Sequence, residues 1–172
     1  VPSDLVAARA YPVKDGQVQR GGVDLMARIR DGRLEWTADE GEWEVWLVRA
    51  ERQANTLNPL LGGIGDTIIR DFYQRFQEAT PNRSAEGLNY FFNDELHIGA
   101  GARVWNIDFA DEFEQRKGYS LLEVFPALWA DLGPVTPKVR IDYADVRMAL
   151  MEERYFQPIY QWHATRGLIF AC

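Results

Sequence analysis

The residues with the clearest capacity for chemistry follow an aromatic run. Tyr90-Phe91-Phe92 is followed directly by Asn93, Asp94 and Glu95, so apolar side chains give way to two carboxylates. If the run is a parallel strand, its carboxyl end faces the ligand, as in other α/β folds. Glycoside cleavage needs one group that protonates the leaving oxygen and another that activates water or attacks carbon, and Asp or Glu can serve in both roles. We therefore predict Glu95 as a general acid, with Asp94 orienting it or the sugar.

The candidate substrate-binding residues near this strand end are Asn93, His97, Arg103 and Trp105. An indole ring can stack on a sugar face, although large rings in loops that enter helices more often pack internally. His97 also fits an ordinary hydrogen-bonded histidine at a strand exit. The competing interpretation of Asp94 and Glu95 is that they cap the following turn in water.

The elements that must position these residues alternate in type along the chain. We expect a buried strand at 43–48, a helix from Asp66, a strand at 88–96, a helix from Asn106 or Asp108 that stops at Gly118, a helix from Asp142 to Gly167 and a strand at 168–172. Strands that alternate with helices favour parallel pairing through right-handed crossovers. The predicted fold class is therefore α/β, a partial (β/α) barrel-type parallel sheet preceded by an antiparallel β-hairpin region.

This order predicts two regions. Residues 1–40 form a β-hairpin region, and residues 41–172 form the first part of a (β/α)-barrel catalytic domain that is truncated at its C-terminus. A closed eight-stranded barrel needs roughly 250 residues, and we expect only about three of its strands here. The chain is therefore expected to be a piece of a larger enzyme and inactive by itself.

Several local signals refine these elements. Asp15-Gly16 and Asp31-Gly32 each supply two residues that tolerate positive φ, so both predict tight hairpin turns. Ser120 with Glu123 has the spacing of a capping box. Within the predicted core-facing helix after Asp66, the apolar positions are Ile68, Phe72 and Phe76, with Ile69 and Tyr73 beside them. In the long C-terminal helix, Pro158 predicts a kink.

Two further patterns have ordinary explanations. Gly62-Gly63-Ile64-Gly65 resembles a phosphate-cradling turn, but it lacks the Lys-Ser/Thr of a phosphate-binding loop, so loop flexibility explains it better. Asp108, Asp111, Glu112 and Glu114 could hold calcium, but acids in a first helical turn are usually a solvated face that favours the positive helix end.

Composition excludes several functional classes. The chain has 26 acidic and 19 basic residues, and its net charge of −7 repels phosphate backbones, so nucleic acid is not an expected partner. A single cysteine, Cys172, cannot form an internal disulfide, and two distant histidines offer no zinc-ligand spacing. No apolar run approaches the roughly 20 residues needed to cross a bilayer. We expect a periplasmic or secreted parent protein in preference to a cytoplasmic one.

Three segments carry a family resemblance. They are Gly32–Thr37 leading to Gly41–Trp46, the strand Tyr90–Glu95, and the segment Phe109–Tyr119. The third reads Phe-x-x-Glu-Phe-x-x-Arg-x-Gly-Tyr and is the most specific. Over most of its length, the chain resembles the large bacterial glycoside hydrolases of the family 106 α-L-rhamnosidase type.

The resemblance implies a (β/α)₈ catalytic domain, inversion at the anomeric carbon by two carboxylates, and a calcium ion that helps to hold the sugar. Many relatives read Asp-Ser-x-Glu at the strand exit, so an ungapped match sets His97 against the glutamate. The second catalytic carboxylate is expected after Cys172, in the rest of the parent polypeptide.

Two other functions fit the same residues. A non-catalytic carbohydrate-binding module could use Trp36, Trp43, Trp46 and Trp105 as stacking surfaces. A different barrel hydrolase, such as a β-galactosidase-like enzyme, could also carry an aromatic strand that ends in Asp-Glu. In each case the expected ligand is a carbohydrate.

Overall fold

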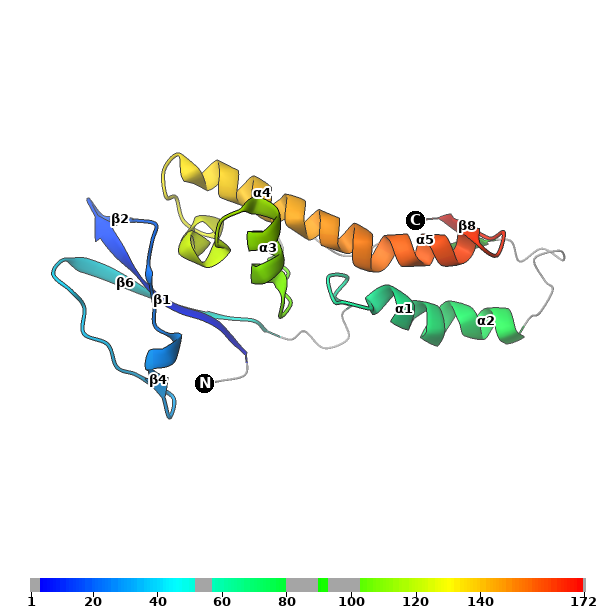
Figure 1. Cartoon of the computed structure of the whole chain (residues 1–172), viewed down its shortest axis with the longest axis horizontal. Helices are drawn as coiled ribbons and strands as arrows, with labels where there is room; N and C mark the ends of the chain where they lie inside the picture. The colour runs from blue at the N-terminus through cyan, green and yellow to red at the C-terminus, as the bar shows by residue number, and fades with distance from the viewer. Residues whose placement is uncertain (1–3, 52–56, 80–89, 93–102, 172) are drawn as a thin grey trace. The chain divides into compact units, whose positions relative to one another are not determined.

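The computed structural model describes residues 4–51, 57–79, 90–92 and 103–171, with the backbone alone for 90–92. The chain forms two compact units, whose elements are labelled in Figure 1. Unit 1 comprises Val1–Thr56 with Ile107–Val146, and unit 2 comprises Leu57–Asn106 with Arg147–Cys172. Each unit has its own cluster of buried apolar side chains.

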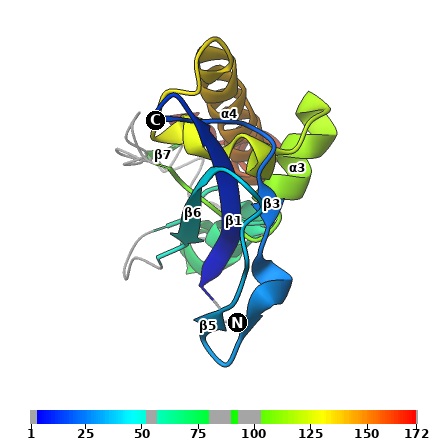
Figure 2. The same cartoon turned by 90° about the vertical axis from the view of Figure 1, so that its left-hand side faces the viewer.

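Unit 1 is built on a four-stranded antiparallel sheet. The central strand is β1 (Leu5–Lys14), which pairs on one side with β6 (Glu42–Arg49). On its other side β1 pairs with β2 (Gln17–Val18) and β3 (Val23–Asp24). Figure 2 shows β1 between β6 and β3.

Among the described strands, β6 pairs with β1 alone and therefore forms an edge. Ala8 lies opposite Leu47, and Ala10 lies opposite Val45. The two alanines are fully buried, whereas Val45 is 44% exposed and Leu47 is 58% exposed. The prediction of a buried strand at 43–48 is therefore wrong, because apolar content does not distinguish an edge strand from a central one.

Both predicted hairpin turns are confirmed. Asp15 and Gly16 have φ values of 52° and 73°, and they join β1 to β2. Asp31 and Gly32 have φ values of 50° and 75°, and they join β4 (Ile29–Arg30) to β5 (Arg33–Leu34). Two residues in the left-handed region give the turn the twist that antiparallel strands require.

Unit 1 has one 3₁₀ turn between β3 and β4 (Met26–Arg28), and its other described helices follow the strands in sequence. They are α3 (Phe109–Lys117), two 3₁₀ turns (Leu121–Glu123 and Phe125–Leu128) and the first part of α4 (Val135–Met151). The hydroxyl of Tyr11 in β1 donates to the carbonyl oxygen of Leu122 over 2.6 Å, and the Gly21 amide donates to the carbonyl oxygen of Glu123 over 3.2 Å. These bonds join β1 and the segment between β2 and β3 to the 3₁₀ turn at Leu121–Glu123.

Helix boundaries in unit 1 match the sequence signals in part. Asp108 precedes α3 and Gly118 ends it with φ 75°, as predicted. The capping box at 120–123 is wrong, because the Ser120 side chain makes no cap hydrogen bond to its 3₁₀ turn. The long helix begins at Val135 and not at Asp142, which lies in its middle.

Unit 2 combines helices with a short parallel ladder. Its elements are α1 (Ile64–Ile68), a π-helical segment (Ile69–Tyr73), α2 (Gln74–Ala79), the end of α4, a π-helical segment (Glu152–Phe156), α5 (Gln157–Ala164), β7 (Tyr90–Phe92) and β8 (Ile169–Ala171). Tyr73, Tyr155, Ile159 and Trp162 form its buried cluster.

A π-helical segment (Glu152–Phe156) lies just before Pro158, where the sequence predicted a kink. Proline has no amide hydrogen, so it cannot make the α-helical hydrogen bond to the carbonyl four residues earlier. Gly65 of α1 packs against this place: a Cβ built on it would lie 2.9 Å from both the Arg154 carbonyl oxygen and the Pro158 Cβ. The glycine therefore permits the close approach of α1 to the helix around Pro158.

The helix at 64–79 differs from its prediction in start and in face. It begins at Ile64 after Gly63, which has φ 74°, so Asp66 does not cap it. Phe72 and Phe76 are 48% and 50% exposed, whereas Tyr73 is 2% exposed. The side of the helix that carries Tyr73, which the prediction placed beside the row of phenylalanines, therefore faces the core.

The predicted fold class is wrong. The largest sheet is antiparallel, because β6 returns alongside β1 and does not start a parallel sheet. In the described residues, parallel pairing occurs only between β7 and β8, a two-stranded ladder that does not make a barrel. The alternation of strands and helices suggested parallel crossovers, but it could not specify which strand β6 pairs with.

Candidate functional site

The aromatic residues of the predicted strand form β7, which pairs with a second strand. β7 runs parallel to β8, with Tyr90 opposite Ile169 and Phe92 opposite Ala171. The carboxyl ends of the two strands therefore lie next to each other. Asn93, Asp94 and Glu95 follow Phe92 directly in the chain, but they lie outside the described residues, as does His97.

The other two predicted substrate-binding residues lie in the segment that leads to α3. Trp105 is partly exposed and Arg103 is exposed. The Asn58 side-chain amide donates to the Trp105 carbonyl oxygen over 2.8 Å, while its side-chain oxygen accepts from the Leu60 amide over 3.0 Å. Asn58 thus bonds to the backbone at Trp105 and also forms a hydrogen-bonded turn within its own loop.

A second asparagine makes the reverse connection. The buried Asn106 donates from its side-chain amide to the Leu60 carbonyl oxygen over 2.9 Å. Arg154 donates to the same oxygen over 2.8 Å from the π-helical segment. We call Asn58, Leu60, Trp105 and Asn106 the asparagine bracket, in which each of two loops is held by a side chain of the other.

Near β8, the buried cluster of unit 2 surrounds a histidine. His163 is 1% exposed, and its ring contacts those of Tyr73, Trp162 and Phe170 at centroid distances of 4.8, 4.9 and 5.1 Å. Its Nδ1 lies 2.7 Å from the carbonyl oxygen of Ile159, so the ring carries a proton on Nδ1.

Burial determines the protonation states in this cluster. It lowers the pKa of His163; the hydrogen bond to Ile159 opposes this shift and the charge of Arg166 adds to it. Burial also raises the pKa of the Tyr73 hydroxyl to about 12, with a smaller contribution from Tyr155. Both side chains are therefore neutral near pH 7 and serve in packing.

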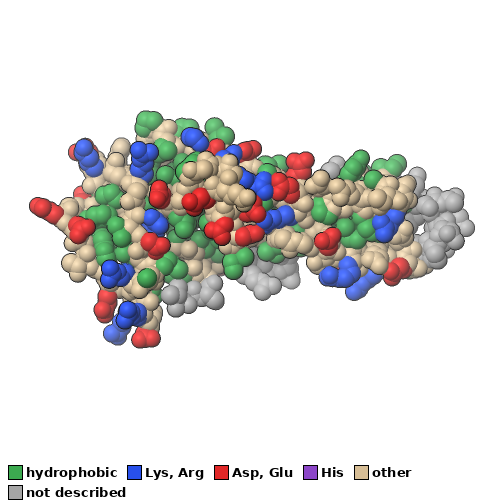
Figure 3. Space-filling model, viewed as in Figure 1, with side chains coloured by type: hydrophobic (Ala, Val, Ile, Leu, Met, Phe, Trp, Pro, Cys, Tyr) green, Lys and Arg blue, Asp and Glu red, His purple; other side chains and the backbone are tan. Residues whose placement is uncertain are grey.

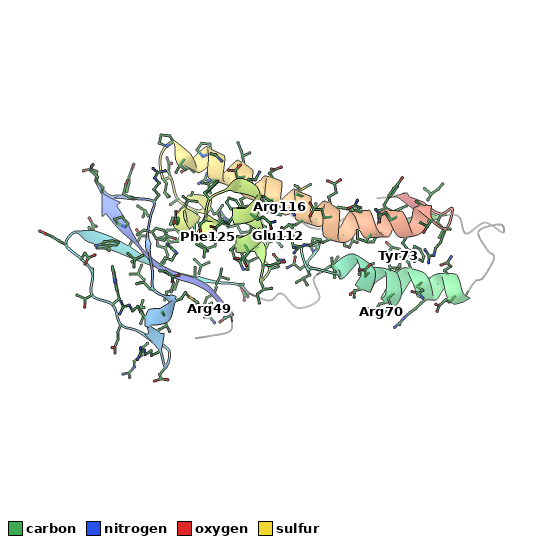
Figure 4. All side chains as sticks on the ribbon, in the orientation of Figure 1. Arg49, Arg70, Tyr73, Glu112, Arg116 and Phe125 are labelled. Atoms are coloured by element: carbon green, nitrogen blue, oxygen red, sulfur yellow. The ribbon has the colours of Figure 1, made fainter. Side chains whose placement is uncertain are left out.

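The most specific motif, Phe109–Tyr119, makes structural contacts in unit 1. Phe109 and Phe113 are fully buried. Glu112 and Arg116 form an ion pair of 3.0 Å along α3, and Figure 4 labels both side chains on that helix. The Tyr119 hydroxyl donates to Asp142 of α4 over 2.7 Å. The motif thus packs α3 and joins its C-terminal end to α4.

Asp142 is the centre of that connection. Besides Tyr119, it receives a hydrogen bond from Lys138 and lies 3.7 Å from the Lys117 ammonium, which also pairs with Asp145. Burial acts to raise the pKa of Asp142, but the hydrogen bonds from Lys138 and Tyr119 outweigh it and hold the pKa below its ordinary value. The carboxylate therefore stays charged near neutral pH and is fully engaged.

The tryptophans of unit 1 contact other rings. Trp36 meets Trp43 edge to face, with centroids 5.4 Å apart and planes at 81°. Trp46 lies 6.0 Å from Trp129 and 6.5 Å from Tyr11. Edge-to-face geometry is typical of aromatic packing and does not present one flat surface to a ligand.

Three other kinds of binding feature would be recognisable among the described residues: a metal-binding cluster, a membrane-spanning helix and a basic patch. No group of three or more His, Cys, Asp or Glu side chains in these ranges is placed to hold a metal ion. None of the described helices is long and apolar enough to cross a bilayer. On the face seen in Figure 3, basic side chains are scattered and do not form one patch.

Comparison of the chain with family models, with curated proteins and with solved structures finds no match.

Sequence reasoning missed the asparagine bracket and Arg154. Asn58-Pro59 carried a usable signal, because an asparagine side chain often accepts from the amide two residues later. The contacts from Asn106 and Arg154 join residues 46 and 94 positions away from Leu60, and no local pattern encodes them.

Proposed function

We propose that this chain belongs to a glycoside hydrolase that cleaves α-L-rhamnoside-like bonds, with Glu95 as the general acid. The parallel ladder of β7 and β8 is the observation that carries the proposal, because it puts the end of the aromatic strand beside a second strand end. Ligands of parallel strands bind outside their carboxyl ends. Asn93, Asp94 and Glu95 are the next residues along the chain from that point.

In this proposal, Glu95 donates its proton to the glycosidic oxygen as that oxygen leaves the anomeric carbon, and a water molecule that loses its proton to a second carboxylate bonds to the same carbon. Asp94 orients Glu95 or a sugar hydroxyl by hydrogen bonding, and Trp105 provides an apolar surface for the sugar ring. Two carboxylates share the work in such enzymes, and the proposal assigns one of them.

The test uses the full polypeptide that carries this chain and a panel of aryl glycosides that includes the α-L-rhamnoside. Glu95→Gln keeps the shape of the side chain but cannot donate the proton, so kcat should fall by about 100-fold or more while KM changes little. A dinitrophenyl glycoside, whose leaving group needs no protonation, should be cleaved at close to the original rate.

The matched control is Glu40→Gln, the same change at an exposed glutamate of unit 1, which should leave kcat unaltered. Two results would contradict the proposal. One is that the full polypeptide cleaves no glycoside, and the other is that Glu95→Gln is as active as the original enzyme on an aryl glycoside whose leaving group needs protonation.

A further inference from the structure

We propose that the outer edge of β6 is an interaction surface, on which β6 of a second copy of the chain pairs antiparallel about a two-fold axis. β6 lies on the side of β1 away from β3, as Figure 2 shows. Pairing at this edge joins two four-stranded sheets into one, and main-chain hydrogen bonds stabilise such strand addition. The proposal concerns unit 1 alone and is independent of the proposed function.

The hydrogen bonds of β1 indicate which backbone groups of β6 face outward. The carbonyl oxygen of Ala8 accepts a backbone hydrogen bond of 2.8 Å from the residue that follows β3. In an antiparallel ladder, both backbone groups of a residue point to one side and the sides alternate, so those of Arg9 face β6. Arg9 lies opposite Trp46. The backbone groups of Trp46 therefore point toward β1, and those of Val45 and Leu47 point to the outer edge.

The side chains and the length of this edge favour pairing. Val45 is 44% exposed and Leu47 is 58% exposed, and their alternate positions put them on the same face of the sheet. β6 is eight residues long and contains neither lysine nor proline. Natural edge strands avoid pairing by being very short or by carrying lysine or proline, and β6 has none of these features. We therefore expect this edge to take up another strand.

The charges along β6 favour a second copy as the partner. Glu42 and Glu44 lie near its start and Arg49 at its end, and all three residues are exposed. Arg49 forms an ion pair with Asp4, yet its side chain remains 67% exposed. When two copies pair antiparallel, the acidic start of each strand meets the basic end of the other, whereas parallel pairing sets like charges together. Such an edge is complementary to itself, as a two-fold interface requires.

One register satisfies the backbone and the side chains together. A two-fold axis beside Trp46 sets Val45 opposite Leu47 of the second copy, and the symmetry repeats this pair. Outward-facing backbone groups then meet, and the exposed apolar side chains lie across from each other. Arg49 lies opposite Trp43 of the second copy, between the two glutamates that flank Trp43 in the sequence.

The first test is the oligomeric state of the full polypeptide that carries this chain, by sedimentation velocity over about a hundredfold range of concentration. The polypeptide should form a dimer, and Val45→Lys should raise the dissociation constant at least about tenfold, because lysine on an edge strand opposes pairing. Val23→Lys is the matched control. Val23 lies opposite Ala10 on the β3 side, as Val45 does on the β6 side, and it is 40% exposed. It should leave the dissociation constant unchanged.

The second test reads the alternation of backbone groups along β6 by hydrogen exchange resolved to single amides. The amides of Val45 and Leu47 should exchange at least about tenfold more slowly in the dimer than in the monomer. The amide of Trp46, which points toward β1, should be protected in both states. A dimer formed through another surface would leave the amides of Val45 and Leu47 unchanged, and that result would overturn the proposal.

The third test exchanges the charges at the two ends of the strand. Arg49→Glu alone, or Glu42→Arg with Glu44→Arg, should raise the dissociation constant about threefold or more, because each homodimer then sets like charges together. An equimolar mixture of the two variants should form mainly heterodimers, counted by native mass spectrometry, since all the charges are then complementary. These positions are exposed, so the mixture decides the orientation even if Val45→Lys disturbs folding.

Four further results would overturn the proposal. The polypeptide could remain a monomer at every concentration, or Val45→Lys and Val23→Lys could dimerise equally well. The charge variants could show no preference for each other, which would exclude antiparallel pairing. A monomer whose Val45 and Leu47 amides are protected at every concentration would show that another segment of the same polypeptide occupies the edge.

Discussion

The two units hold their helices together in different ways. In unit 1, α3 and α4 are joined by a polar network centred on Asp142, with partners from Tyr119, Lys117 and Lys138. In unit 2, α1 meets the helix around Pro158 through a glycine, and the cluster near β8 is a set of contacting rings. Charge and hydrogen bonding are prominent in the first contact, whereas the second depends on close packing at a glycine. The two should therefore differ in their response to added volume, lost charge and acid.

The largest expected effect is in unit 2. Gly65→Ala adds a methyl group 2.9 Å from the Arg154 carbonyl oxygen and the Pro158 Cβ, neither of which can move without shifting a helix. We expect the free energy of unfolding of unit 2 to fall by about 3 kcal/mol, measured by urea denaturation followed by tryptophan fluorescence.

Gly62→Ala is the matched control, since nothing lies within 4 Å of its added Cβ and its backbone has no positive φ. It should leave stability unchanged or raise it slightly. Equal losses in the two variants would show that the tight packing of α1 is not what holds unit 2.

The second-largest expected effect comes from a substitution that breaks the polar contact between α3 and α4 in unit 1. Asp142→Ala leaves the Tyr119 hydroxyl and two lysines without their shared acceptor, and we expect a loss of about 2 kcal/mol in urea denaturation. Asp145→Ala removes a carboxylate that also contacts Lys117 but whose side chain is 67% exposed, so its cost should be well below that of Asp142→Ala. Comparable costs would mean that net charge, and not the geometry at Asp142, stabilises this contact.

Acid should destabilise unit 2 at a higher pH than unit 1. The pKa of His163 is lowered on folding, so the unfolded chain binds its proton first and unit 2 loses stability as the pH falls below about 6.5. The pKa of Asp142 is also lowered, so its contribution to unit 1 is lost only as the pH falls below about 3.9.

Hydrogen exchange of α5 and α3, followed against pH by mass spectrometry, would separate the two transitions. His163→Phe should remove the first transition without altering the second. Simultaneous loss of protection in both helices near pH 6 would contradict the assignment of the histidine to unit 2 alone.

The smallest expected effect is at Ser120. A serine that caps a helix contributes about 1 kcal/mol, but Ser120 makes no side-chain cap bond to its 3₁₀ turn. Ser120→Ala should therefore change the urea midpoint of unit 1 by less than the error of the measurement. A loss of about 1 kcal/mol would instead show that Ser120 caps the turn, as the sequence predicted.

Local features of the fold could be predicted from the sequence, whereas long-range strand pairing could not. Turns with Asp-Gly and the α3 boundaries at Asp108 and Gly118 are local, because a few adjacent residues determine their backbone angles. The partner of β6 is not local, since it depends on residues of β1 that lie 29 to 44 positions earlier. For this reason the hairpins were predicted correctly and the sheet was not.

In the candidate site, sequence reasoning identified the strands themselves but not the long-range contacts that hold them and the nearby loops in place. The parallel partner of β7 was foreseeable only as a type of pairing, because β8 follows it by nearly 80 residues. In the helix at 64–79, the apolar pattern included both Phe72 and Tyr73, but it could not tell that Tyr73 is the buried ring.

The exposed side of β6 has a practical consequence for work with this chain in isolation. Backbone amides and carbonyls along a strand that has no second neighbour within the described structure can recruit a strand from another molecule, and Val45 and Leu47 make that encounter apolar. Turbidity and slow precipitation on concentration are the usual signs of such recruitment. A lysine introduced at Leu47 is the simplest way to keep solutions clear, because strand edges in natural proteins carry charge for the same purpose.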